Sequence, residues 1–267
     1  MVIKIWKQFV NTHKIEEEKQ MHKQFVTYIM GGQTMLDELR ALDQAGVDYV
    51  EIGIPYSDPV ADGPVIMEAG QSAIQSGRRT QDVFDDLKSV QGQLSTKVVL
   101  MTYAHSIETY GEEAFFKAAE DAGVYGLIIP DMPHEYIEQL KEKYPNRKLK
   151  FISLIAMTAD PKRREHIAKH AEGFIYTVTM NEVTGKNGTF HPELLEHIEE
   201  IKRIASVPVL AGFGIRTADH VQNISQASDG VIIGSEIVRR FKEDGIPSTI
   251  EFIQTLQHAL ENNSVKQ

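Results

Sequence analysis

The sequence predicts an α/β protein of the TIM (β/α)8 barrel class, preceded by an extra N-terminal helix. Short runs of β-branched and aliphatic residues recur eight times along the chain, and amphipathic stretches with helical periodicity separate them. A length of 267 residues suits one large barrel better than two small domains. Strict alternation of eight strands with helices favours closure of a parallel sheet into a barrel.

The predicted strands begin after a separate N-terminal segment. Residues 1–20 place apolar side chains at helical spacing before a charged run, so we expect a helical extension of a single domain that covers residues 1–267. In chain order, the predicted strands are Phe25 to Met30, Tyr49 to Ile54, Lys97 to Tyr103, Gly126 to Pro130, Leu149 to Ile155, Phe174 to Val178, Val207 to Gly212 and Val231 to Gly234.

Two of the predicted helices have clear sequence signals. The first carries an N-cap residue at Thr34, an acidic third position, an apolar stripe and a terminal glycine at Gly46. The second, from Pro192 to Ile204, places leucine and isoleucine on one face. The polar connection from Pro55 to Pro64 is long, and its prolines make it rigid.

The composition argues against several classes of protein. The 28 basic and 38 acidic side chains give a net charge of −10, which repels nucleic acid and anionic lipid. Because cysteine is absent, disulfides and cysteine-bound metals are excluded. No segment approaches the roughly 20 apolar residues that span a bilayer, and the start lacks the apolar core of a secretory signal. We therefore expect a cytoplasmic protein with no nucleic-acid or membrane partner.

Glu51 is the first candidate catalytic residue, since active sites of such barrels form at the C-terminal ends of the strands. Val50 and Ile52 take the opposite face of its strand, so the alternation directs Glu51 into the barrel. Burial raises the pKa of a carboxyl toward neutrality, which suits a group that donates and accepts protons. The alternative is a structural ion pair, although the nearby candidate Lys97 stands at the start of its strand.

Asp62 is the second candidate, in the rigid loop after the strand of Glu51. Pro59 and Pro64, on either side of it, restrict the loop that carries it. As an alternative, this carboxylate could cap the helix that begins near Val65. Two carboxyls, one inside the barrel and one in the loop above, favour a division between acid/base and substrate-holding roles.

Glycines after the last three strands predict a phosphate site. They are Gly185, Gly212 and Gly214 on either side of Phe213, and Gly234 before Ser235. In this fold, the loops after the seventh and eighth strands and a short helix N-terminus bind phosphate through backbone amides, without requiring lysine. Ordinary turn chemistry is the alternative for any one of these glycines.

The spacing of histidine, carboxylate and serine residues along the chain does not indicate a metal site or a serine nucleophile. The histidines form no ligand pattern with carboxylates along the chain, so we expect no metal site and read His166 and His170 as surface residues. No Gly-x-Ser-x-Gly motif marks a nucleophile either.

The segment from Glu51 to Pro64, EIGIPYSDPVADGP, resembles the signature of the tryptophan synthase α subunit family. Three more motifs resemble the family in the same order and spacing: Gly126 to Pro133, Gly212 to Ile215 and Gly234 to Val238. The resemblance implies a TIM-barrel lyase of tryptophan biosynthesis. Such an enzyme splits indole-3-glycerol phosphate into indole and glyceraldehyde 3-phosphate by a retro-aldol cleavage.

By this resemblance, Glu51 protonates the indole ring carbon and assists loss of the side-chain hydroxyl proton, while Asp62 holds the indole N–H. The residues that it assigns to the indole pocket are Tyr28, Met101, Tyr103 and Tyr176, and Met101 could equally belong to the barrel core. The phosphate contacts that it implies are Gly185, Phe213, Gly214, Gly234 and Ser235, in agreement with the glycine pattern.

The resemblance also implies a partner. The family pairs its α subunit with a pyridoxal-phosphate β subunit in a heterotetramer of two α and two β subunits, so no cofactor is expected in this chain. The segment after Glu51, together with Asp131, would face that partner.

Two alternatives remain open at this point. Thr179 to Glu182 replace a stretch that is usually Ser-Arg-x-Gly in the family, and this difference motivates the alternative of a regulatory phosphosugar-binding subunit with little turnover of its own. Another phosphosugar barrel, such as an isomerase or epimerase, would share the glycines but need a different acid/base set.

Overall fold

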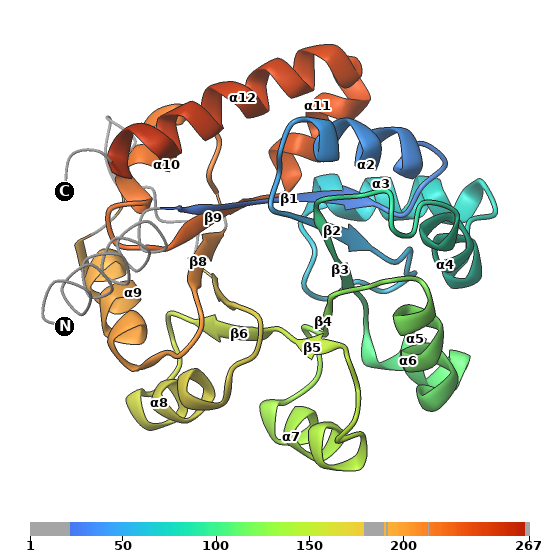
Figure 1. Ribbon diagram of the computed structural model, residues 1–267, viewed down its shortest axis with the longest axis horizontal. Helices are drawn as coiled ribbons and strands as arrows, with labels where there is room; N and C mark the ends of the chain where they lie inside the picture. The colour runs from blue at the N-terminus through green and yellow to red at the C-terminus, as the bar shows by residue number, and fades with distance from the viewer. Residues whose placement is uncertain (1–21, 179–189, 191, 213, 265–267) are drawn as a thin grey trace, which may run out of the picture.

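The computed structural model describes residues 22–178, 190, 192–212 and 214–264, and these form a ring of strands surrounded by helices (Figure 1). All the strand pairs are parallel, in the order β5-β4-β3-β2-β1-β9-β8-β7-β6. The helix expected in residues 1–20 lies outside the described residues.

The strands lie close to the positions predicted from the sequence. They are β1 Gln24–Met30, β2 Tyr49–Gly53, β3 Lys97–Met101, β4 Gly126–Ile128, β5 Lys150–Phe151, β6 Ser153–Ala156, β7 Ile175–Val178, β8 Val209–Gly212 and β9 Gly230–Ile233.

β5 and β6 are two parts of the single strand predicted from Leu149 to Ile155, interrupted at Ile152. β5 pairs with β4 and β6 pairs with β7, so the two parts together occupy the fifth position of the ring. The amide of Ile152 still donates to the carbonyl of Leu127, at 2.9 Å, which continues the pairing with β4. The predicted eight-position TIM barrel is therefore confirmed, with its fifth strand divided between two neighbours.

The helices form the outer layer. They are α2 Met35–Gln44, α3 Pro64–Gln75, α4 Thr80–Ser89, α5 Ala104–Tyr110, α6 Glu112–Asp121, α7 His134–Lys143, α8 Pro161–His170, α9 Pro192–Ile204, α10 Ala218–Ile224, α11 Ser235–Glu243 and α12 Gly245–Ser264. The predicted helix from Pro192 to Ile204 matches α9. Thr34 is the N-cap residue of α2 as predicted, but its hydroxyl donates to Glu38, at 2.6 Å, instead of capping a backbone amide.

Alternation along the strands separates two apolar layers. Outward side chains such as Val50 and Ile52 pack with the helices in the larger layer. The inward side chains fill the barrel, and they are Val26, Tyr49, Val99, Ile128, Ile152, Phe174, Leu210 and Ile232. Full burial of one such side chain contributes about 1.5–3 kcal/mol to the stability of the native state. The packed side chains therefore form a stable floor beneath the site.

The loop after β2 returns over the mouth of the barrel. It leads into α3, which packs against β1 and against α11. Pro64 begins α3, where a missing amide hydrogen costs the helix nothing. This packing places the residues just before α3 near the N-terminus of α11.

Candidate active site

Glu51 lies inside the barrel, in register with Tyr28 of β1 and Val99 of β3. Its side chain is 3% exposed. Burial, and then the negative charge of Asp62, raise the pKa of Glu51 from 4.5 to about 8. At neutral pH this carboxyl therefore holds a proton that it can donate.

Lys97 does not neutralise Glu51. Its ammonium group lies at the opposite end of the barrel, 3.4 Å from the hydroxyl of Tyr49 and over the rings of Tyr49 and Tyr125. Among the described residues, no basic side chain forms an ion pair with Glu51. The geometry therefore gives no support to a structural ion pair at this position.

Asp62 lies in the loop above Glu51 and is half-buried. Burial raises the pKa of Asp62, and a hydrogen bond from Tyr103 opposes this rise. Its Oδ1 atom is buried and has no hydrogen-bond partner among the described residues. Gly63, not Asp62, is the N-cap residue of α3, and no side chain caps that helix. The carboxylate thus retains an unused acceptor at the cavity.

Two tyrosines complete the wall around the acids. Burial, and then the neighbouring carboxyls, raise the pKa of Tyr28 and Tyr176 well above the usual value, so both hydroxyls stay protonated. Each ring occupies space that only glycine leaves open. A Cβ atom on Gly53 would lie 1.8 Å from the Tyr28 hydroxyl oxygen, and one on Gly212 would lie 2.7 Å from that of Tyr176.

The other two candidates for the indole pocket occupy different positions. Met101 lines the cavity and also packs against the inner apolar layer. Tyr103 is buried behind the loop, where its hydroxyl accepts from the amide of Ala61 at 3.2 Å and bonds to Asp62. Its ring stacks on Tyr56 with centroids 4.9 Å apart. Tyr103 thus contacts the acid that lines the cavity and is not itself among the lining residues.

The predicted phosphate residues that the structure describes meet at the start of α11. Gly234 is the N-cap residue, and Ser235 is the first residue of the helix. First-turn amides have no acceptor within a helix, and the helix dipole adds positive potential there. Gly214 has a φ of +75°, which favours glycine, in the turn after β8. Gly185 and Phe213 lie outside the described residues.

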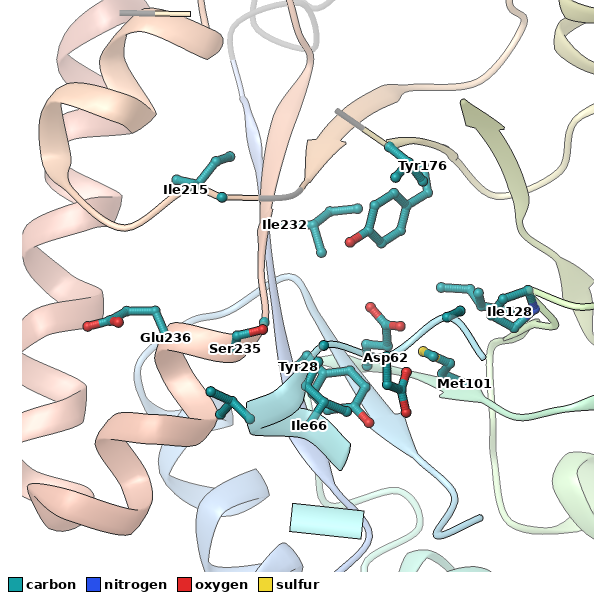
Figure 2. Close-up of a pocket in the computed structure, with 18 of the residues that line it drawn as sticks. Tyr28, Asp62, Ile66, Met101, Ile128, Tyr176, Ile215, Ile232, Ser235 and Glu236 are labelled. Atoms are coloured by element: carbon teal, nitrogen blue, oxygen red, sulfur yellow. The ribbon is translucent and has the colours of Figure 1, made fainter. Parts of the chain in front are cut away.

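One cavity of about 310 Å³ joins the two acids to these glycines. In Figure 2, Tyr28, Asp62 and Tyr176 surround its centre, and Ser235 borders it from the start of α11. The lining residues that were not predicted from the sequence include Ile66, Ile128, Leu154, Ile232 and Arg216. Four of these are apolar side chains typical of any barrel, so the sequence carried no signal for them. For Arg216, the only signal in the sequence was its position two residues after Gly214.

The arrangement can hold a phosphorylated molecule at one end and transfer a proton at the other. A family model described as tryptophan synthase alpha chain matches residues 15–265. The chain belongs to this family. A curated tryptophan synthase alpha chain from Staphylococcus saprophyticus is 57% identical over 240 residues, which cover 90% of this chain and 100% of the relative.

Solved structures agree with the family membership. A protein from Aquifex aeolicus superimposes with a TM-score of 0.83 at 31% identity, covering 92% of this chain and 96% of that one. A structure of tryptophan synthase subunit alpha from Legionella pneumophila has a TM-score of 0.81 at 27% identity, covering 92% and 98%.

Membership in the tryptophan synthase alpha chain family establishes the reaction. The chain is the component of this lyase (EC 4.2.1.20) that cleaves indole-3-glycerol phosphate in tryptophan biosynthesis. Membership therefore excludes the isomerase and epimerase alternatives. Thr179 to Glu182, which motivated the regulatory alternative, lie outside the described residues. An alpha chain carries no cofactor itself, since pyridoxal phosphate belongs to the beta subunit, the partner that membership implies. Within the described part of the chain, none of the helices combines the length and apolarity needed to cross a membrane.

Proposed function

We propose that Glu51 is the acid and base of the cleavage. Its protonated carboxyl donates a proton to the indole ring carbon that bears the glycerol phosphate side chain. The carboxylate then takes the proton of the adjacent hydroxyl while the carbon–carbon bond breaks, which forms the aldehyde and releases indole. Glu51 ends in its starting protonation state, so one residue with a pKa near neutrality serves both steps.

Asp62 would hold the indole N–H. Protonation of the ring carbon places positive charge on the ring nitrogen, and a nearby carboxylate stabilises that charge. The unpartnered Oδ1 of Asp62 supports this role. Its bond to Tyr103 would keep the carboxylate in position, so we assign Tyr103 a positioning role and leave the indole contacts to Tyr28, Met101 and Tyr176.

The phosphate group would bind at the opposite end of the cavity. We assign it to the backbone of Gly214, Gly234 and Ser235, together with Gly185 and Phe213 from the segments outside the described residues. The open amides at the start of α11 support this assignment, because they offer hydrogen-bond donors without a lysine. Binding energy from the phosphate would then hold the indole ring against Glu51.

Family membership supports a proposal for the assembly. We propose that two copies of this single-domain chain, including residues 1–20, join two beta subunits in the cytoplasm. A tryptophan synthase structure from Mycobacterium tuberculosis superimposes with a TM-score of 0.81 at 27% identity, covering 91% of this chain and 95% of that one. Val60 is 80% exposed in the loop after β2, which supports a docking role for this loop together with the exposed Asp131.

The observation that carries the mechanism is the burial of Glu51 in the cavity that also reaches Gly234 and Ser235. Replacement Glu51→Gln keeps the shape and hydrogen bonding of the side chain but removes its proton transfer. We expect indole formation to be lost, by at least about 10³-fold, while binding of glycerol phosphate stays within twofold of the wild type. Glu251→Gln, at an exposed position on α12, serves as the matched control. Near-normal turnover in Glu51→Gln would refute the proposed mechanism.

A further inference from the structure

A cluster of metal-ligating side chains lies between α7 and α8, two neighbouring helices of the outer layer (Figure 1). His134 and Glu138 are one turn apart on α7, and His166 lies on α8. One ligand atom from each of the three residues lies within 4.8 Å of the other two. None of the three lines the cavity of the candidate active site.

The spacing of these atoms suits a single ion. His134 Nε2 lies 3.5 Å from Glu138 Oε1, and His166 Nε2 lies 3.1 Å from the same oxygen. Zinc binds histidine nitrogen and carboxylate oxygen at about 2.0–2.2 Å, so two ligand atoms of a tetrahedral site stand about 3.3–3.5 Å apart. Small side-chain movements would therefore bring all three groups onto one ion.

His134 provides independent evidence for a ligand. The residue is only 8% exposed, and its Nε2 has no hydrogen-bond partner in the part of the chain that the structure describes. This nitrogen nevertheless faces Glu138 and His166, whose ligand atoms are within reach. A buried polar atom without a partner destabilises the native state, and metal coordination would remove this cost.

The charges around the cluster also suit a cation. Burial lowers the pKa of His134, so the imidazole is neutral and has a lone pair free to bind a metal. Burial acts to raise the pKa of Glu138, but the hydrogen bond to His166 and the nearby imidazoles lower it, so this carboxylate is ionised. Lys141, on the same helix, donates to the backbone carbonyl of His170 at 2.8 Å, and its charge also lowers the pKa of His134.

We propose that His134, Glu138 and His166 form a binding site for a divalent transition-metal ion of the zinc type, with water completing the coordination. Imidazole and carboxylate ligands favour zinc over magnesium or calcium, which prefer all-oxygen sites. The linear spacing of the histidines did not predict this site because its ligands come from two helices. The bound ion would join α7 to α8 and stabilise the native state, independently of the lyase reaction.

Calorimetric titration of the metal-free, full-length chain with Zn²⁺ tests the proposal. We expect a single equivalent to bind, Co²⁺ to give the intense visible absorption of a tetrahedral site, and the melting temperature to rise with Zn²⁺ concentration. Glu138→Gln and His166→Gln should each weaken Zn²⁺ binding by at least about tenfold and abolish the rise in melting temperature. Both positions are half-buried or exposed, so both variants should fold, which far-UV circular dichroism checks.

His258→Gln is the matched control, because it removes an exposed histidine from α12. It should bind Zn²⁺ as tightly as the wild type. Absence of a stoichiometric Zn²⁺ ion in the wild type, or equal affinity in wild type and His166→Gln, would overturn the proposed site.

Discussion

At the scale of single residues, the chemistry depends on the environment of Glu51. The sequence alternation predicted that its side chain points inward, because Val50 and Ile52 had to face the helices. The alternation could not predict how far the pKa would rise, since that depends on the burial of the carboxyl and on Asp62, which is brought near by the fold.

The raised pKa makes the stability of the protein depend on pH. Burial and Asp62 raise the pKa of Glu51 from 4.5 in its ordinary state to about 8 in the native protein. The unfolded chain therefore loses this proton at a lower pH than the native chain does. Between these two values, a rise in pH lowers the native stability by up to about 1.4 kcal/mol per pH unit.

Glu51→Gln removes this titration. Its free energy of unfolding, measured by urea denaturation, should exceed that of the wild type by an amount that grows between about pH 5 and about pH 8. The exposed control Glu251→Gln should follow the wild type at every pH. A constant difference between Glu51→Gln and the wild type across this range would show that Glu51 titrates normally.

A separate prediction concerns the charge of Asp62. Asp62→Asn removes the negative charge that faces the developing positive charge on the indole nitrogen. We expect kcat to fall by roughly 10²-fold, with little change in the dissociation constant of glycerol phosphate. Asp58→Asn, at an exposed position of the same loop, should keep its kcat in the isolated chain. Equal effects of the two substitutions would argue against a specific role for Asp62.

At the scale of elements, the close packing of glycine against aromatic rings shapes the cavity. A Cβ atom added to Gly53, in β2, would lie only 1.8 Å from the hydroxyl oxygen of Tyr28. Gly53→Ala must displace a buried ring, so we expect a loss of about 1–3 kcal/mol in the free energy of unfolding and a reduced kcat. Gly32→Ala, where the nearest atom is 3.9 Å away, is the control. Wild-type stability in Gly53→Ala would contradict this packing.

The elements were predictable where local signals and packing agree. The amphipathic pattern from Pro192 to Ile204 predicted α9 with its observed bounds. The interruption at Ile152 was not predictable, because it arises from pairing with two different neighbours around a closed ring. The sequence also could not show that Gly63 and not Asp62 occupies the N-cap position of α3, because both residue types favour that position.

At the scale of the whole molecule, the barrel brings together groups from both ends of the chain. Glu51 lies in β2, whereas Gly234 and Ser235 come directly after β9. The ring of strands places all three residues at one cavity. The fold class predicted this meeting, since strand ends of a parallel barrel share one face. It did not predict the cluster of His134, Glu138 and His166, whose ligands meet only through helix packing.

The most direct test of the mechanism is a crystal structure of the Glu51→Gln variant with indole-3-glycerol phosphate bound. We expect the phosphate to accept hydrogen bonds from the amides of Gly234 and Ser235, Asp62 to bond to the indole N–H, and the side chain of residue 51 to contact the ring carbon to be protonated. A phosphate bound away from the start of α11, or an indole ring beyond the reach of residue 51, would refute the mechanism.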